Sequence, residues 1–299
     1  MSRSFPPDVI VLDSDSLLHA RLGRGKRNPR ITQAKSFRLA ADTFAPSLVT
    51  PELVNEAALA EAVRRLRNET GRWEKGSILL PDSWFRINLV ELQSFNERAA
   101  DASEVVRWSL KRTLPIPPEE LRVAHTVLSR SGTSAKLLVV SAMEKTLAKI
   151  ERVFNDGGIE TILIEPLGLN LWNAISVREN GTANSDRLFL YLRESEFTTA
   201  VFRGEEPIFI RSRNLTAERP LHQEIRLSAS YLRDALRTET FSQCYVAGNG
   251  SLAEVASTLS TEFNSPVATV ALRDFAEETP SNVNGYDAEL TACTGVFTG

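Results

Sequence analysis

Cysteine and long apolar runs are both scarce in this sequence, and each absence narrows what the chain can be. Only Cys244 and Cys293 occur among 299 residues, too few for the disulfide framework of a small secreted protein, so we expect a reducing compartment. No stretch approaches the roughly 18 to 20 apolar residues of a transmembrane helix. Residues 1–7 lack the apolar core of a signal peptide. These absences predict a cytoplasmic protein that reaches a membrane only through partners.

A strong excess of one charge is also missing. Lys and Arg number 35 against 38 Asp and Glu, a net charge of −3, so the chain carries no overall basic field for nucleic acid. Its one basic cluster is RLGRGKRNPR, residues 21–30, which is short and contains Gly and Pro. This composition is typical of a solvated loop between strands. The alternative is a contact with anionic lipid headgroups or with an acidic partner.

Motifs for hydrolytic or metal chemistry are absent as well. His19, His125 and His222 do not have the spacing of metal ligands. The sequence contains neither a G-x-S-x-G nucleophile elbow nor a Walker A loop. The pair Glu119–Glu120 stands at the start of a short turn, where acidic residues interact favourably with the helix dipole. The sequence therefore gives no reason to expect an enzyme.

What the sequence does contain is a compact α/β unit between Glu104 and Pro166. Its order is helix, proline-rich turn, strand, hairpin at SGTS, strand, helix and strand. The first helix has apolar residues at helical spacing and ends at Pro115, which lacks a backbone donor. The second helix ends at Gly157–Gly158. Trp108, Trp172 and Phe154, all at helical positions, are predicted to be core residues.

The remainder repeats one plan twice. VIVLDSDSLLHARL, from Val9, reads as a strand, a turn at Asp13–Ser16 and a return strand, and a third strand follows over Ile31–Ala40. The same succession recurs from Leu188, with its own third strand. The C-terminal YDAELTACTGVF predicts a helix of small residues that could pack closely against a sheet. Two similar halves, one carrying an insertion, are the resulting expectation.

Four segments follow one another along the chain: EVVRWSLKRTLPIPPEELRVAHTVL, KLLVVSAMEKTLAKIERVFNDGGIETILIEP, EIRLSASYL and CYVAGNGSLAEVASTL. In this order they resemble the PilM family of type IV pilus assembly proteins and, more distantly, the cytoplasmic part of the GspL family of type II secretion. The resemblance implies an α/β fold of the actin-like (ribonuclease H-like) bilobal type. It predicts a first half over 1–100, an inserted α+β subdomain over 101–166, and a second half over 167–299 ending in a helix. Only NLTAERPLHQ stands where the family has a helical insertion, so the second-half subdomain is expected to be reduced.

The resemblance also locates a nucleotide site, and this sequence departs from it. Actin-like ATPases hold phosphates on two hairpins written roughly D-x-G, in which glycine lets backbone N–H groups approach. In the first hairpin, Asp13, Ser14 and Ser16 occupy the site positions, and in either possible alignment a carboxylate lies where phosphate should be. In the second hairpin, Arg193 replaces the glycine. Gly248 and Gly250 keep the glycine-bearing turn of the adenosine side, which also reads as an ordinary strand-to-helix turn.

These departures predict a degenerate ATP site and no cofactor, although ATP with Mg²⁺ stays the alternative. By resemblance, the chain is expected to be a non-enzymatic scaffold at the cytoplasmic face of the inner membrane. Its expected partners are other pilus platform proteins and a PilN-like single-span protein, whose cytoplasmic tail would bind in a groove beside Glu104–Pro166. Nucleic acid is not among them. Two other hypotheses remain open: a diverged but active actin-like ATPase, and a GspL-like secretion component.

Overall fold

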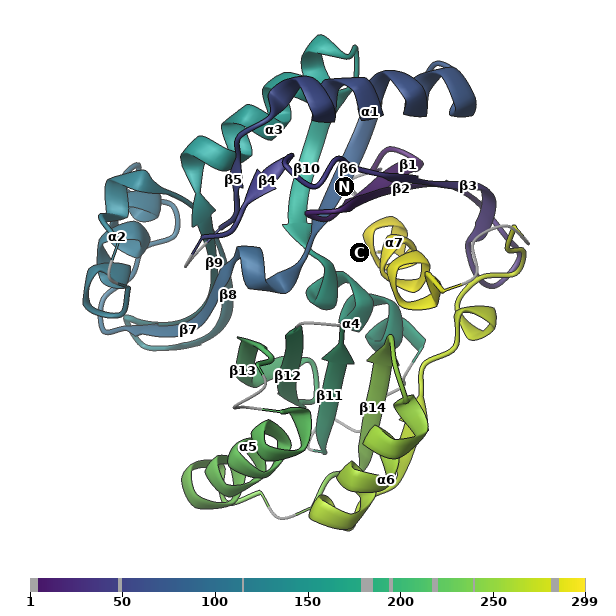
Figure 1. The fold of residues 1–299 in the computed structure, drawn as a ribbon. Coiled ribbons are helices and arrows are strands. Elements are labelled where there is room, and N and C mark those ends of the chain that lie inside the picture. The colour runs from purple at the N-terminus through teal and green to yellow at the C-terminus, as the bar shows by residue number, and fades with distance from the viewer. Residues whose placement is uncertain are drawn as a thin grey trace.

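The structure is a computed structural model that describes residues 5–47, 50–114, 116–178, 185–193, 196–216, 220–238, 240–280 and 285–298. Two mixed sheets lie one above the other in Figure 1, and two helices, α4 (Leu167–Arg178) and α7 (Asp287–Thr298), lie between them. A smaller sheet with its own helix projects from the upper half. No helix in the described ranges combines the length and the apolar character needed to cross a membrane.

The first sheet has the strand order β10-β6-β1-β2-β3. Strands β1, β2 and β3 are antiparallel, whereas β6 and β10 run parallel to β1. The bounds are β1 (Asp8–Leu12), β2 (Ser16–Gly23), β3 (Arg30–Arg38), β6 (Lys75–Leu80) and β10 (Glu160–Pro166). The pattern of a hairpin plus a third strand, read from the sequence, is confirmed here.

Helices α1 (Glu56–Thr70) and α3 (Glu144–Asp156) cover the outer face of this sheet. Helix α1 begins where the Asn55 side chain accepts the N–H of Ala58, and it ends at Gly71, whose φ of +85° suits glycine. The buried side chains of α1 and α3 form one core with the outward side of the sheet. Two short strands, β4 (Phe44–Ala45) and β5 (Glu52–Leu53), pair with each other between β3 and α1.

The second sheet repeats the first in the order β13-β12-β11-β14-β15. Again three antiparallel strands are followed by two parallel ones. The bounds are β11 (Asp186–Leu192), β12 (Glu196–Arg203), β13 (Glu206–Asn214), β14 (Gln243–Gly248) and β15 (Val267–Thr269). Helices α5 (Leu221–Leu236) and α6 (Leu252–Phe263) cover its outer face. Because α5 begins at Leu221 and β13 ends at Asn214, the connection is too short for a further subdomain.

Helices α4 (Leu167–Arg178) and α7 (Asp287–Thr298) fill the space between the two sheets. The small-residue helix α7 packs against β1, β2 and β14, which confirms the expected sheet contact, and its most extensive contact is with helix α4. A Cβ added at Gly295 would overlap the backbone carbonyl of Asn170 on α4. The small side chains of α7 thus permit a close helix crossing in the centre of the molecule.

The inserted unit contains the three-stranded sheet β7-β9-β8 and helix α2. Its bounds are β7 (Arg86–Leu92), α2 (Ala102–Ser109), β8 (Leu121–Ser131) and β9 (Ser134–Met143). It has a small core of its own. This unit does not coincide with the predicted range 101–166. Strand β7 belongs to the unit but precedes residue 101, whereas α3 packs on α1 and β10 pairs with β6 in the first half. Local sequence patterns do not reveal a parallel pairing between strands that are far apart in the sequence.

Two details of helix α2 differ from the sequence expectation. The helix ends at Ser109 and continues as a 3-10 turn over Leu110–Arg112, while the predicted stop at Pro115 lies outside the described residues. Trp108 was predicted to be core, which is wrong: it is 51% exposed. The helix has only one sheet to pack on, so its second apolar flank stays in solvent. Trp172 and Phe154 are buried, as predicted.

Candidate functional site

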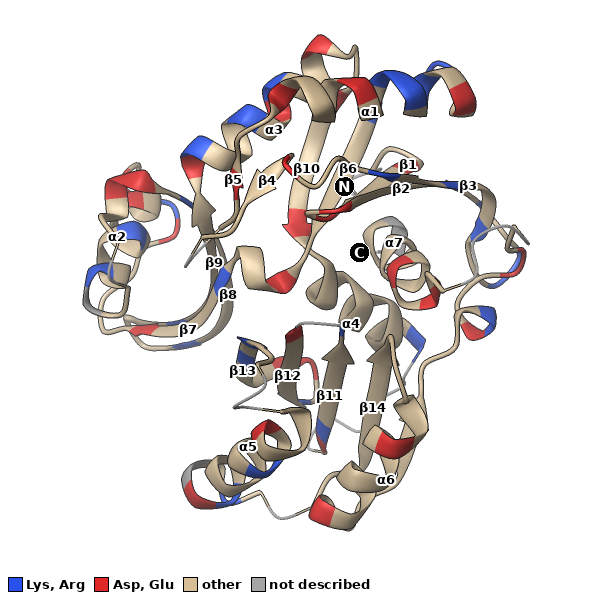
Figure 2. Ribbon diagram, in the orientation of Figure 1, with Lys and Arg blue, Asp and Glu red and all other residues tan. Residues whose placement is uncertain are grey.

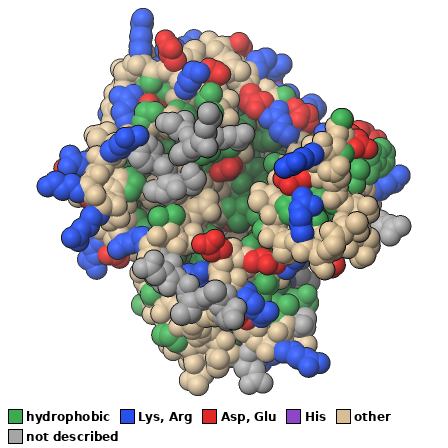
Figure 3. All heavy atoms as spheres, turned by 180° about the vertical axis from the view of Figure 1, so that it is seen from behind, with side chains coloured by type: hydrophobic (Ala, Val, Ile, Leu, Met, Phe, Trp, Pro, Cys, Tyr) green, Lys and Arg blue, Asp and Glu red, His purple; other side chains and the backbone are tan. Residues whose placement is uncertain are grey.

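A cleft of ≈ 850 Å³ opens between the two halves and the inserted unit. Its lining includes the turn between β1 and β2, the turn after β11, the start of β7, the end of β13 and the start of α7. Figure 3 shows a hollow beside the inserted unit, which lies at the right of that view. The sequence-predicted residues Asp13, Ser14 and Ser16 all line this cleft.

The two hairpin turns facing the cleft are built alike. The N–H of Asp13 donates to the carbonyl of Ser16 at 2.8 Å, and the N–H of Arg193 donates to the carbonyl of Glu196 at 2.8 Å. Strand pairing places Leu12 opposite Leu17 in one hairpin and Leu192 opposite Phe197 in the other. Asp13 and Arg193 therefore occupy equivalent positions in the two halves of the molecule.

These two equivalent residues form an ion pair with each other across the cleft. The guanidinium of Arg193 donates to Oδ2 of Asp13, and its Nη1 lies 3.3 Å from Oε1 of Glu196. The side chain of Arg193 is only 14% exposed. An ion pair of this kind links the first half directly to the second, at the point where the two turns approach one another.

The surroundings of Arg193 are acidic. Burial opposes its charge, yet Tyr191, Asp13 and Glu196 together hold the pKa of Arg193 above its ordinary value. Glu289, at the start of α7, is 4% exposed, and burial raises its pKa although Arg193 acts against the rise. In the part of the chain that the structure describes, Oε2 of Glu289 has no hydrogen-bond partner. Arg193 is thus the counter-ion of a mostly buried acidic cluster.

A further buried acid lies behind the cleft, and sequence reasoning did not identify it. Asp82, in the 3-10 turn Asp82–Trp84 after β6, is 1% exposed and accepts the N–H of Gly168 at 2.7 Å through Oδ1. Burial raises the pKa of Asp82 to about 6, and neighbouring Glu196 adds to the rise. A Cβ at Gly168 would overlap this carboxylate. The sequence signal that could have indicated this residue is a carboxylate that closely follows the carboxyl end of an apolar strand.

The glycine turn after β14 reaches the same cleft through Asn249. Gly248 has a φ of +119°, and a Cβ there would overlap the carbonyl oxygen of Leu192 on β11. Gly250 has a φ of +95°, but a Cβ there meets only the end of the Leu192 side chain, at 3.8 Å. The packing of β14 on β11 therefore accounts for glycine at 248 without any ligand.

The side chains at the two hairpin turns do not fit a phosphate site built on bare backbone. Phosphate binding on these hairpins requires backbone N–H groups with open space in front of them. At the two equivalent turn positions the chain instead has a carboxylate, which repels phosphate, and an arginine side chain already paired with that carboxylate. The described residues include no group of three or more His, Cys, Asp or Glu arranged to hold a metal ion.

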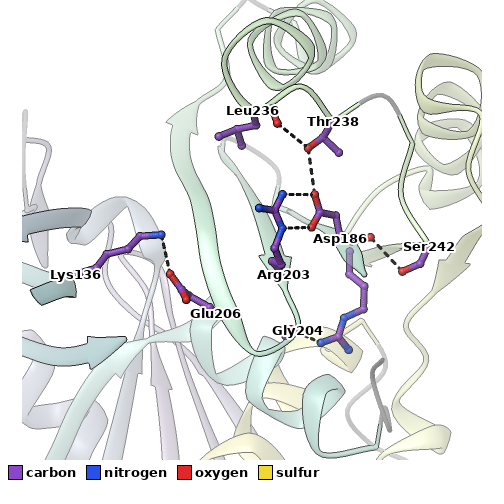
Figure 4. Close-up of polar contacts among 9 residues, drawn as sticks. Lys136, Asp186, Arg203, Gly204, Glu206, Leu236, Thr238 and Ser242 are labelled. Carbon is purple, nitrogen blue, oxygen red and sulfur yellow. Dashed lines mark hydrogen bonds and ion pairs between the residues drawn. The ribbon is translucent and has the colours of Figure 1, made fainter. Parts of the chain in front are cut away.

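Two further contacts fix the inserted unit next to the cleft. Nζ of Lys136 on β9 lies 2.8 Å from Oε1 of Glu206 at the start of β13, which joins the unit to the second half (Figure 4). On the other side, Arg122 at the start of β8 pairs with Glu144 and Glu151 of α3 at 2.7 and 2.5 Å. Figure 4 also shows Arg203 binding both carboxylate oxygens of Asp186, which holds the turn that carries Glu206.

No protein-family model and no curated protein matches this chain, but solved structures do. A chain of the PilM–PilN type IV pilus biogenesis complex is 17% identical, with a TM-score of 0.78 and 96% of each chain covered. A Bacteroides thetaiotaomicron protein with an actin-like ATPase fold and unknown function is 11% identical, with a TM-score of 0.60 and 96% and 94% coverage. The cytoplasmic domain of EpsL, an inner membrane component of the Vibrio cholerae type II secretion system, is 9% identical, with a TM-score of 0.53 and 98% and 94% coverage.

At these identities the comparisons establish the fold. The chain has the actin-like ATPase fold, with the additional sheet and helix in its first half. The fold class expected from the sequence is confirmed, and so is the resemblance to PilM at the level of fold. Function has to be argued from the site.

Proposed function

We propose that the chain is a scaffold of an inner-membrane platform for type IV pilus assembly, without a nucleotide cofactor and without enzymatic activity. The observation that carries the nucleotide-free part is the ion pair between Asp13 and Arg193. It joins the two turns that hold phosphates in actin-like ATPases, and it supplies internally the charge contact that a bound nucleotide with its metal would provide. The cleft is thus held together by the chain itself.

The scaffold role is supported by the likeness to a chain of the PilM–PilN complex over 96% of both chains. From it we infer a PilN-like single-span membrane protein as partner, bound through its cytoplasmic tail, and a location at the cytoplasmic face of the inner membrane. Other platform proteins are expected to bind elsewhere. The weaker likeness to the EpsL domain keeps a secretion platform as the alternative.

We assign the tail-binding surface to the inserted unit, which we bound at residues 86–143 rather than 101–166. In the described ranges, β8 pairs with β9 on one side only, so its other edge offers backbone groups to an extended peptide. Helix α2 packs beside β8 and leaves Val105 and Trp108 exposed. An exposed tryptophan beside a free strand edge is the kind of residue on which binding energy concentrates.

Peptide capture tests this assignment. The purified protein is titrated with synthetic N-terminal peptides of single-span membrane proteins encoded beside it, and one of them is expected to bind. Trp108→Ala should weaken that binding about thirtyfold or more, because an interface tryptophan contributes roughly 2 kcal/mol or more. Tyr231→Ala serves as the control, since Tyr231 is 51% exposed on α5 in the other half. If no neighbouring tail binds, the proposed function is wrong while the fold assignment stands.

A further inference from the structure

The hairpin of β2 and β3 has a charge unlike that of the rest of the chain. Residues 16–41 contain seven Lys and Arg and no Asp or Glu. This leaves 28 of the 35 basic residues and all 38 acidic residues for the remainder. The seven are Arg21, Arg24, Lys26, Arg27, Arg30, Lys35 and Arg38. An acidic molecule thus carries one wholly basic element, which is a strong electrostatic asymmetry.

Ion pairs between side chains are confined to the strands of this hairpin. Arg21 pairs with Asp8 at 2.8 Å, Lys35 with Glu69 at 2.8 Å, and Arg30 lies 3.6 Å from Glu277. At the tip, Arg24, Lys26 and Arg27 are exposed and make no ion pair within the described part of the chain. Three cations are therefore available to an external anion.

The tip is held in place from within. The carboxylate of Glu277 accepts the backbone N–H groups of Lys26, Arg27 and Asn28 at 3.0, 2.5 and 3.2 Å. These hydrogen bonds, chiefly that from Arg27, lower the pKa of Glu277 to about 2, so it stays charged. A Cβ at Gly25 would overlap the carbonyl of Asn28, so glycine is needed for this turn. Because the backbone is already ordered, binding through the tip does not require the loop to be ordered first.

The position and composition of the tip indicate that it binds to an extended anionic surface and does not form a pocket for a small ligand. It lies at the edge of the molecule away from the inserted unit (Figure 1), on the β3 side that carries Lys and Arg in Figure 2. In Figure 3 basic side chains gather along the corresponding left edge. Residues 23–28, GRGKRN, contain no apolar side chain, so the tip lacks the apolar anchor typical of a protein interface.

We propose that the tip formed by Arg24, Lys26 and Arg27 docks on anionic phospholipid headgroups. The chain then touches the membrane directly, in addition to any membrane partner. Each Lys or Arg near an anionic membrane raises the partition of a protein onto that membrane roughly fivefold, so the three together raise it on the order of a hundredfold. Salt should weaken the contact, since exposed charges are screened. This proposal does not depend on tail binding, because a chain that captures no tail would still bind anionic vesicles.

Vesicle co-sedimentation of the full chain at low salt tests the proposal. The protein should bind vesicles that contain phosphatidylglycerol and not vesicles of phosphatidylcholine alone. Arg24→Ser, Lys26→Ser and Arg27→Ser combined should lower the partition on the order of a hundredfold. The control removes the same charge elsewhere, with Arg64→Ser, Arg72→Ser and Arg98→Ser, three residues that are likewise exposed. The control should keep its binding within about threefold, since its charges lie away from the contact.

A second variant separates charge from loop order. Glu277→Gln removes a negative charge beneath the tip and leaves the three cations, so binding should be equal to that of the wild type or a few-fold stronger. Loss of binding in this variant would mean that shape rather than charge carries the contact, and the proposal would be wrong. The proposal would also be wrong if both triple variants lost binding equally, or if the protein did not bind anionic vesicles at low salt. An acidic protein would then be the expected partner of the tip.

Discussion

Arg193→Ala is expected to lower the free energy of unfolding by about 3–5 kcal/mol, the usual cost of removing one member of a buried ion pair. The variant leaves Asp13, Glu196 and Glu289 close together without their counter-ion. Urea denaturation followed by tryptophan fluorescence measures the change. The cost should be larger near pH 8 than at lower pH. Burial already raises the pKa of Glu289, and Arg193 opposes that rise, so at lower pH Glu289 takes up a proton and its unpaired charge is lost.

Arg213→Ala provides the matched control for that result. Arg213 lines the same cleft, but it is exposed, so its removal should change stability by no more than about 0.5 kcal/mol. Equal effects of the two substitutions would show that the pair between Arg193 and Asp13 does not hold the halves together.

Gly248→Ala is the second substitution with a large expected cost, about 3–5 kcal/mol. Part of it is conformational, because a φ of +119° is unfavourable for alanine by about 1–2 kcal/mol. The larger part is steric, because the new Cβ would overlap the backbone of Leu192 and force β14 away from β11. Thermal or urea unfolding measures the loss.

Gly250→Ala separates the two causes. Its φ of +95° brings a similar conformational cost, but the added Cβ makes only an ordinary contact with the Leu192 side chain at 3.8 Å. A loss of only about 1–2 kcal/mol is therefore expected. Should both alanine variants prove equally stable, backbone packing would not be the reason for glycine at 248, and a ligand role for this turn would have to be considered again.

Local pattern was enough to predict most of the fold from the sequence. Alternating apolar residues and polar turns identify hairpins such as β1–β2 and β8–β9, and glycine marks the ends of α1 and α3. The repeated hairpin plan indicated two related halves. What local pattern does not contain is long-range pairing. The parallel contact of β10 with β6 places Glu160–Pro166 in the first sheet, outside the inserted unit.

The chemistry of the cleft was less predictable for the same reason. The sequence showed that Asp13 and Arg193 each depart from a glycine-bearing hairpin, but not that they neutralise each other over 180 positions of chain. The sequence does not distinguish Asp82 as a site residue, because a single carboxylate after a strand is common. Trp108 was assigned to the core, because helical spacing alone cannot show that α2 has a packing partner on one side only.

The ion pair across the cleft and the exposed surfaces are consistent with one kind of molecule. An internal ion pair links the two halves, and we propose the inserted unit and the basic hairpin tip as the surfaces that bind partners. We propose that this actin-like fold keeps its shape without nucleotide and serves as a fixed platform. Nucleotide binding is therefore the decisive property.

Isothermal titration of the purified chain with ATP and excess Mg²⁺ tests that claim most directly. Because we propose that the ion pair between Asp13 and Arg193 takes the place of a bound phosphate, we expect no binding heat at nucleotide concentrations up to about 1 mM. This limit corresponds to a binding free energy weaker than about −4 kcal/mol. A micromolar dissociation constant would contradict the account and would support an active, diverged actin-like ATPase.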